Sequence, residues 1–297
     1  MESAGTTARR EPFHWRTAIS YKTRDRVVIR GYNVNDLTGR VSFAEMAYLV
    51  WRGELPPEPH ARMLDAILVN QCEHAFSPSS AACRFVTSGG VPLHVGVAGG
   101  LLALGSLHGT ADRPAALFKE ALARMDREGL TLEETARRVA GEARREGRRL
   151  PGYHHAQHIV DPRTARLLEL ADAYGVAGRH VAMARAIEAA TEEFWGRRIY
   201  LNGPGAVGAI CMDMGFDLDL IKGVYLLSRI VGLIAHTYEE MHRERGWRAS
   251  TNAPIVQPLD LELQKPEFYD GPPERTLPPE RTPVPAPGAG GGGGTGR

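Results

Sequence analysis

The chain has 297 residues, of which 43% are hydrophobic and 24% charged, and its formal net charge is +1. This composition is typical of a globular enzyme with enough apolar material for one large domain or two modest ones. The balance of 36 basic and 35 acidic side chains gives no electrostatic reason to expect nucleic acid or a membrane surface as the main partner.

The two ends of the chain differ in composition from its middle. Residues 1–12 are polar and contain no apolar segment of the kind found in signal peptides, so we expect a flexible leader. Residues 269–297 are rich in proline and then in glycine, which predicts a disordered tail. The folded unit is therefore expected over residues 13–268.

The cysteines and the hydropathy pattern bear on the cellular compartment of the protein. The three cysteines are widely spaced and form no CxxC pair, which favours a reducing environment. The sequence contains no run of eighteen apolar residues, so it predicts no membrane-spanning helix. We therefore expect a cytoplasmic protein that binds neither a membrane nor nucleic acid.

Helical periodicity dominates the predicted folded unit. At residues 42–53 apolar side chains recur at helical spacing after Ser42, and Glu45 completes a capping box with that serine. Strand-like alternation is weak and confined to residues 26–30 and 198–201, so the sequence predicts an all-α fold. Further helices are predicted at residues 77–90, 131–147, 165–174, 180–195, 205–214 and 218–245.

An apolar segment at residues 93–105 contains four glycines. Glycine in a helix costs ~1 kcal/mol relative to alanine, so several together imply that another backbone must approach closely. That neighbour is either a helix in the same core or the facing subunit of a dimer.

Histidines are concentrated in three short segments that also contain a carboxylate or a turn-forming glycine. These segments hold His74, His108 and the adjacent pair His154 and His155. A histidine in a glycine-rich loop can present its imidazole to a cleft, and its pKa lies near neutrality. The alternative for each is an ordinary surface or core residue.

The spacing of His154 and His158 resembles that of a metal-binding pair on a helix. Asp161 and Pro162 follow at once, and the proline breaks any helix that would align the two rings. We therefore expect no metal site.

Five short segments follow one another along most of the chain. The first is IRGY at residues 29–32 through GELP at residues 53–56, and the second is Glu73-His74 followed by Ser79-Ser80. Next come GSLHG at residues 105–109 and GYHH…DPR at residues 152–163. The last is an R-x-x-G-x-x-A-H-x-x-E pattern that begins at Arg229. In this order the segments resemble those of the citrate synthase and citryl-CoA lyase superfamily.

This resemblance implies a citrate synthase-like fold and a homodimer. A large helical domain, about residues 13–109 and 201–268, and a small helical domain, about residues 110–200, would close over a cleft. The substrates would be a CoA thioester and a small carboxylate, with no tightly bound cofactor. The compact length is similar to that of the citryl-CoA lyase subgroup.

The resemblance also implies roles for individual side chains. His108 would hydrogen-bond the thioester carbonyl and stabilise the enol, and His155 would exchange a proton with the hydroxyl oxygen of the substrate. His74 and Arg163 would hold substrate carboxylates, the arginine through a bidentate pair. Arg248 is a weaker candidate for a second clamp, with a solvated cation at a helix end as the alternative.

Two positions depart from the family pattern, and one further histidine lies near the implied CoA path. Pro204 stands where the family has an aspartate that exchanges a proton with the acyl carbon, and loss of such a base costs roughly 10²–10⁴-fold in rate. His154 stands where glycine is usual; it either packs outward or lies with His158 in the CoA-binding region.

The proline leaves three hypotheses open. The protein is a lyase in which water or another residue protonates the enol, or it acts on a different acyl-CoA with a base such as His154, Asp112 or Glu239. The third hypothesis is that it binds or hydrolyses CoA esters without carbon–carbon chemistry.

The sequence favours the lyase among these functions. We predict a citryl-CoA lyase-like enzyme that cleaves a citryl-CoA-type thioester to an acyl-CoA and a 2-oxo acid. The alternatives are a citrate or alkylcitrate synthase, which condenses an acyl-CoA with oxaloacetate, and a non-catalytic or hydrolytic CoA-ester-binding protein.

Overall fold

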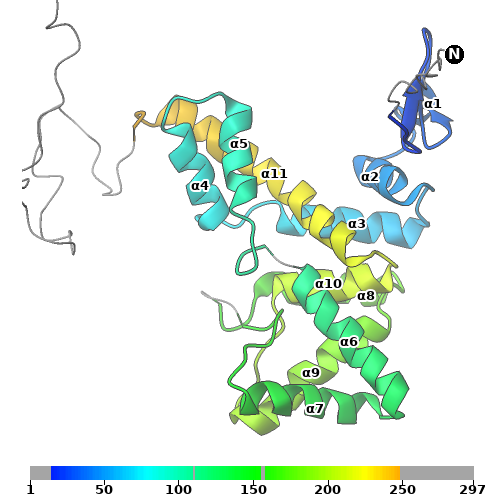
Figure 1. Cartoon of the computed structure of the whole chain (residues 1–297), viewed down its shortest axis with the longest axis vertical. Helices are drawn as coiled ribbons and strands as arrows, with labels where there is room; N and C mark the ends of the chain where they lie inside the picture. Colours follow the sequence, from blue (N-terminus) through cyan, green and yellow to red (C-terminus); the bar gives the residue numbers. More distant parts are fainter. Residues whose placement is uncertain (1–14, 110, 155–157, 248–297) are drawn as a thin grey trace, which may run out of the picture. The chain divides into compact units, whose positions relative to one another are not determined.

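The computed structural model describes residues 15–109, 111–154 and 158–247 (Figure 1). Helices make up most of this part of the chain, which confirms the predicted all-α class. The helices are α1 (Val34–Leu37), α2 (Phe43–Arg52), α3 (Glu58–Gln71), α4 (Pro78–Thr87), α5 (Leu93–Leu102), α6 (Asp112–Glu128), α7 (Leu132–Arg145), α8 (Pro162–Ala173), α9 (Arg179–Trp195), α10 (Gly203–Asp213) and α11 (Leu218–Arg243). The predicted leader, the tail and the end of the predicted folded unit lie outside the described residues, and the predicted division into two domains stays a prediction.

A small antiparallel sheet precedes the helices. Its strands β1 (Ser20–Lys22), β2 (Val27–Ile29) and β3 (Tyr32–Asn33) follow one another in sheet order. Strand β2 lies within the predicted strand at residues 26–30. The second predicted strand, at residues 198–201, is reduced to a single bridge between Leu201 and Tyr153.

Side-chain caps begin several helices where the sequence predicted them. Ser42 and Glu45 form both hydrogen bonds of a capping box at α2, and Thr131 and Glu134 do the same at α7. These caps satisfy backbone N–H groups that a helix start otherwise leaves without a partner. The predicted helix starts are therefore confirmed at both positions.

The helices pack in two sets (Figure 1). Helices α6, α7, α9 and α10 contact one another, and α4 and α5 pack against each other and against α11. The larger core joins buried residues such as Phe118, Ile187 and Ile210, and a smaller one consists of Cys83, Val97 and Leu233. Removal of these side chains from water is the main stabilising contribution to the fold.

The glycines of α5 allow the close helix contact that the sequence predicted. A Cβ atom on Gly100 would lie 2.9 Å from the backbone oxygen of Ser79 in α4 and 2.7 Å from Leu233 in α11. One on Gly96 would lie 2.2 Å from Thr87 and 2.9 Å from Thr237. Of the two explanations offered by the sequence, packing inside the chain therefore accounts for these two glycines.

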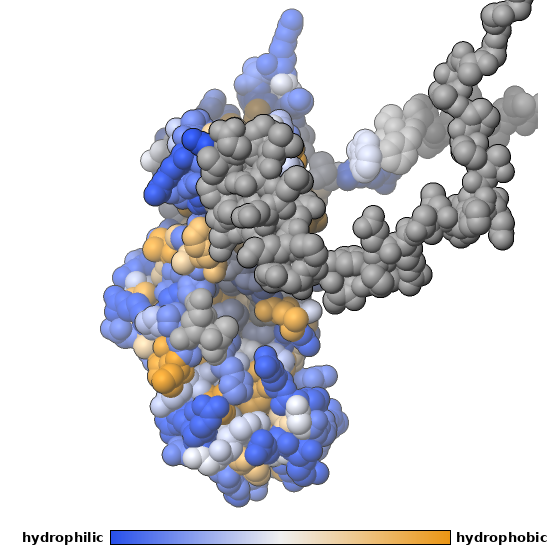
Figure 2. Space-filling view, turned by 90° about the vertical axis from the view of Figure 1, so that its left-hand side faces the viewer, coloured by the Kyte–Doolittle hydropathy of each residue, from blue (hydrophilic) through white to orange (hydrophobic). Residues whose placement is uncertain are grey.

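The described surface is mixed in polarity. Hydrophobic residues form separate groups among hydrophilic ones on the face seen in Figure 2. Within the described residues no helix combines the length and the hydropathy needed to cross a bilayer.

Two glycine-to-alanine changes test this packing and have opposite expected signs. A Cβ on Gly208 of α10 would lie 2.5 Å from the backbone oxygen of Ala111 and 3.1 Å from the nitrogen of Ala115. Because neither backbone atom can move cheaply, Gly208→Ala should lower the free energy of unfolding by ~1–3 kcal/mol. Gly223 of α11 has no atom within 4 Å of a built Cβ, so Gly223→Ala should raise it by ~0.5–1 kcal/mol. Urea unfolding measures both, and equal effects would contradict the helix contact.

Candidate functional site

His108 lies in the loop between α5 and α6 and is bonded to the first turn of α4. The backbone N–H of Ser79 donates to its Nε2 at 3.3 Å, and the Ser79 hydroxyl oxygen is 2.9 Å from the same nitrogen. A backbone N–H can only donate, so Nε2 must carry a lone pair. The proton of the neutral imidazole is therefore on Nδ1, which remains a donor.

The surroundings of His108 favour this neutral form. Burial, and then the positive charges of Arg229 and Lys222, lower the pKa of His108 below the ordinary value for histidine. The N-terminal end of α4 acts in the same direction, because the helix dipole disfavours a cation there. A neutral imidazole can stabilise a developing oxyanion by donating a hydrogen bond without transferring its proton.

Lys222 of α11 holds the loop that carries His108. Its Nζ atom lies 3.5 Å from the carbonyl oxygen of Leu104 and 3.4 Å from that of Gly109. Gly109 has a φ of +73°, and a Cβ there would lie 2.6 Å from the Leu104 side chain and 2.8 Å from the ring of Tyr225. Only glycine fits this turn without a shift of its neighbours.

Arg229 is a buried cation on the same helix. It is 1% exposed, and its Nη2 donates to the hydroxyl of Tyr225 at 3.2 Å. Its Nε and Nη1 atoms are buried without a hydrogen-bond partner among the described residues. A guanidinium that is buried without a counter-charge is costly, so these donors fit an anionic group that binds there.

Arg229 begins the R-x-x-G-x-x-A-H-x-x-E pattern in the sequence, but no role was predicted for it. The available signal was an arginine in the run from residue 224 to residue 235, in which Ser228 is the only other polar residue apart from the hydroxyl of Tyr225. A charged residue at a core-facing position of a helix is rare unless it is paired or binds a ligand.

Arg163, a predicted carboxylate clamp, is paired within the chain. Its Nε and Nη2 atoms donate to the two oxygens of Asp161 at 2.9 and 2.7 Å, and Nη1 lies 3.5 Å from Gln71 Oε1. Asp161 also caps α8 through the N–H of Arg163 and accepts the N–H of Gly203 at 2.9 Å. Nη1 makes the weakest contact of this guanidinium, and the predicted role of Arg163 toward a substrate stays a prediction.

Of the remaining predicted site residues, His74 and His158 are among the described residues. His74 and His158 are both half-buried, and their ring centres are 5.8 Å apart although 84 positions separate them in the sequence. The structure thus brings these two predicted residues together. His155 and Arg248 lie outside the described residues, so their predicted roles stay predictions.

A cavity of about 840 Å³ opens beside the His108 loop. Ser106 and Leu107 form one part of its lining, and the turn that ends at His154 forms another. The guanidinium groups of Arg113, Arg148 and Arg149 also line it, and Arg113 Nη1 donates to the Ser106 carbonyl at 3.0 Å. Arginines gathered around a hollow of this size suit a ligand with several phosphate or carboxylate groups.

The first turn of α10 borders the same cavity through Asn202. The side-chain oxygen of Asn202 accepts the N–H of Gly205 at 3.0 Å, and its Nδ2 donates to the carbonyl oxygen of His154 at 2.6 Å. Pro204 lies in this first turn, where a residue without an N–H is well tolerated. The proline therefore fits the helix start but contributes no titratable group.

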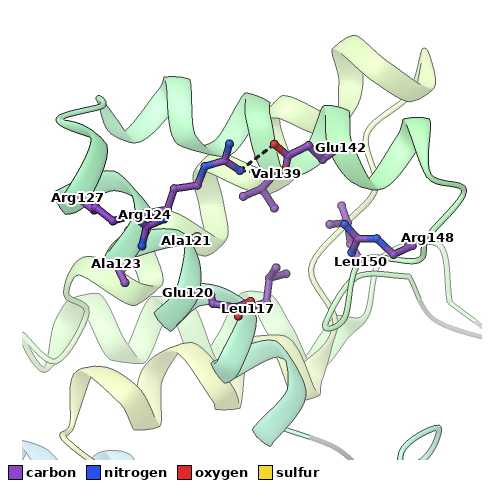
Figure 3. A pocket seen from close by; sticks show the side chains of 10 residues that line it. All are labelled: Leu117, Glu120, Ala121, Ala123, Arg124, Arg127, Val139, Glu142, Arg148 and Leu150. Carbon is purple, nitrogen blue, oxygen red and sulfur yellow. Dashed lines mark hydrogen bonds and ion pairs between the residues drawn. The ribbon is translucent and has the colours of Figure 1, made fainter.

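A second cavity, of about 350 Å³, lies between α6 and α7 (Figure 3). Arg124 points across it to Glu142, with Nη1–Oε distances of 2.8 and 2.9 Å. Arg127 contacts Glu128, and Arg148 is paired with Glu146. Arg148 lines both cavities, whereas Arg124 and Arg127, which line only this one, have carboxylate partners within the chain. We therefore place the functional site at the cavity beside the His108 loop.

The described residues contain no group of three or more histidine, cysteine, aspartate and glutamate side chains that could hold a metal ion. His154 and His158 therefore form no such group within these residues.

The chain is similar to known proteins in sequence and in structure. The family model described as the citrate synthase C-terminal domain matches residues 56–250. The glyoxysomal citrate synthase of Cucurbita maxima is 30% identical over 217 residues, which are 69% of this chain and 39% of that protein. The chain spans between 39% and 51% of the length of the curated citrate synthases that it matches.

Solved structures give a fuller match. The citryl-CoA lyase from Hydrogenobacter thermophilus has 36% identity and a TM-score of 0.76, and the match covers 89% of this chain and 97% of that one. Citrate synthase from Thermoplasma acidophilum has 21% identity and a TM-score of 0.62, over 80% of this chain and 59% of that one. The second likeness shows the fold alone, whereas the first extends over almost the whole of the compared chain.

Asp161→Asn tests the pair that holds Arg163. Although burial by itself raises it, the hydrogen bonds from Arg163 and Gly203 hold the pKa of Asp161 well below its usual value. A carboxylate with a depressed pKa contributes stability above its unfolded pKa and loses it as pH falls. At pH 7 the variant should therefore be less stable by ~1–3 kcal/mol.

That difference should shrink progressively below about pH 4, because the unfolded chain then binds a proton at this carboxylate, whereas the folded protein does so only at lower pH. Urea unfolding of both proteins between pH 7 and pH 2.5 measures the difference. A stability difference that does not depend on pH would contradict the charge pair. Asp172→Asn, at an exposed pair with Arg185, is the matched control and should change stability by less than ~1 kcal/mol.

Proposed function

Because the chain belongs to the citrate synthase family, we propose that it is a lyase that cleaves a citryl-CoA-type thioester to an acyl-CoA and a 2-oxo acid. The observation that carries the proposal is His108, held as a neutral donor by the first turn of α4 close to the charge of Arg229. The 36% identity to a citryl-CoA lyase, with a TM-score of 0.76, supports the lyase.

The reaction needs an electron sink next to the thioester. A base removes the proton of the substrate hydroxyl, and His155 is the residue that we assign to this step. The carbon–carbon bond then breaks, and its electron pair forms an enol thioester whose oxygen gains negative charge. The Nδ1–H of His108 would donate to that oxygen, which is where a preorganised donor lowers the barrier.

Pro204 leaves one proton transfer without its usual carrier. In cleavage the enol carbon must take up a proton, and in condensation the same carbon must lose one. Proline can neither give nor accept that proton, so the proline affects both directions. The lyase direction is proposed from the 36% identity to a citryl-CoA lyase.

The charges of the site suit a polyanionic substrate. We assign the unpaired donors of Arg229 to a carboxylate of the citryl portion, with Arg163, His74 and Arg248 as further contacts. The cavity beside the His108 loop would take the CoA portion, with its three arginines near the phosphates. Of the two predicted CoA contacts, His154 lines this cavity, and the ring of His158 lies beside that of His74. No tightly bound cofactor enters the reaction.

We also propose a homodimer formed through α4, α5 and α11. The helix α11 exposes Val231, Ile234, Tyr238 and Met241 at 60%, 43%, 57% and 45%. Their spacing of three and four residues places them on one face of the helix. Leu102 at the end of α5 is also exposed, at 87%. An apolar face of this kind is suited to burial against the same face of a second copy.

The test is turnover of citryl-CoA. The native protein should release acetyl-CoA and oxaloacetate, and His108→Gln should lower kcat by about 10²–10³-fold because the oxyanion loses its donor. Mass spectrometry of the CoA esters follows the reaction. His94→Gln, an exposed histidine of α5, is the matched control and should leave kcat unchanged.

Two outcomes would replace the proposal. Faster release of CoA from acetyl-CoA and oxaloacetate than cleavage of citryl-CoA would indicate a synthase. Binding of citryl-CoA without turnover, and without an effect of His108→Gln, would indicate a CoA-ester-binding protein.

A further inference from the structure

Cleavage leaves one proton transfer unassigned. Once the carbon–carbon bond has broken, the enol thioester must take up a proton at carbon before the acyl-CoA is complete. The donor has to reach the cavity beside the His108 loop and must titrate near neutral pH.

Few side chains of the described cavity lining meet this requirement. The guanidinium groups of its three arginines do not release protons at physiological pH. Tyr153 donates its hydroxyl to the carbonyl oxygen of Ala184 at 2.8 Å, and complete burial raises its pKa. Ser106 and Asn202 have no proton to give in this range. His154 is the remaining titratable residue of this lining.

The other two residues considered from the sequence are less suited. Glu239, near the C-terminal end of α11, forms ion pairs with Arg84 of α4 and with Arg243 of α11. Asp112 starts α6, does not line the cavity, and has one carboxylate oxygen buried without a hydrogen-bond partner among the described residues.

The backbone of His154 is held in an unfavourable conformation. Its φ is +69°, in the left-handed region that favours glycine. The His154 N–H donates to the carbonyl oxygen of Tyr200 at 3.1 Å, and its own carbonyl oxygen accepts Nδ2 of Asn202 at 2.6 Å. Strain that is maintained by hydrogen bonds in this way is found preferentially at functional positions.

The same hydrogen bonds fix the backbone from which the imidazole projects. Asn202 donates its N–H to the carbonyl oxygen of Gly152 at 2.8 Å and caps α10 through the N–H of Gly205. His154 is therefore linked by a single side chain to the turn in which Pro204 replaces the aspartate of the family pattern.

We propose that His154 donates the proton that the enol carbon takes up, and that it removes this proton in the reverse direction. This assignment rests on the proposed lyase function and adds a catalytic residue to it. The carbonyl double bond re-forms from the enol oxygen, and the enol carbon–carbon pair binds the proton from the imidazolium. The imidazole then recovers a proton from solvent, while the hydroxyl proton taken by the base returns to solvent, so protons balance over a turnover.

The charges around His154 favour release of its proton. Burial, and then the neighbouring Arg197 and Arg149, lower the pKa of His154. Its imidazolium is therefore a stronger acid than that of an ordinary histidine.

His154→Gly separates a catalytic from a structural role. Glycine adopts a positive φ without strain, so Tm should rise by about 2–4 °C. The kcat for cleavage of citryl-CoA should nevertheless fall by about 10²-fold or more. Exchange of the acetyl-CoA methyl protons with D2O, followed by mass spectrometry, should fall by a similar factor.

Imidazole added to His154→Gly should restore part of both rates, because a free base can enter the vacated space. His154→Asn provides a second variant, since asparagine tolerates this conformation but does not carry a proton near neutral pH. It should lower kcat as strongly as the glycine variant. A rise in KM for citryl-CoA with unchanged kcat, or no recovery with imidazole, would overturn the proposal.

The native protein separates this inference from the proposed function. Should the native protein fail to cleave citryl-CoA, the lyase function itself would be wrong. Should it cleave citryl-CoA as fast as His154→Gly does, the lyase would stand and the role of His154 would fall.

Discussion

The hydrogen bond from the backbone N–H of Ser79 to Nε2 of His108 determines what the site can do. It fixes the tautomer of the imidazole and leaves Nδ1–H as the donor. Because the donor is a backbone N–H, it cannot act as an acceptor toward this nitrogen. The chemistry of His108 thus depends on where α4 begins.

The position of α4 depends in turn on close helix packing. The absence of a side chain at Gly100 lets α5 approach the first turn of α4 at Ser79 itself. On the other side, Arg84 of α4 forms a buried ion pair with Glu240 of α11, at 2.9 Å. The helix α11 also supplies Lys222 to the His108 loop and Arg229 beside it. Helix α11 therefore holds α4, positions the loop that carries His108, and supplies the positive charge near that histidine.

The sequence predicted the parts that depend on local signals. The all-α class and the capped starts of α2 and α7 follow from side chains close to one another in the chain. Helices α3 and α6 were not predicted, and neither has a side-chain cap at its start. Helix α9, which also has no side-chain cap, was predicted from its periodicity alone. Arg163 was predicted to be a clamp for a substrate, but pairing with Asp161 depends on the geometry of a helix start that spacing alone does not give. Two donors of Arg229, Nε and Nη1, are buried without a hydrogen-bond partner among the described residues, and this depends on the three-dimensional packing rather than on a sequence pattern.

The most direct test of the donor role of His108 is a measurement of its protonation state by ¹⁵N NMR of the imidazole. We expect a neutral ring with the proton on Nδ1, which stays neutral at pH 6.5 because its pKa is lowered. A ring that carries its proton on Nε2, or that is half-protonated at or above pH 6.5, would contradict the donor role on which the proposed function depends.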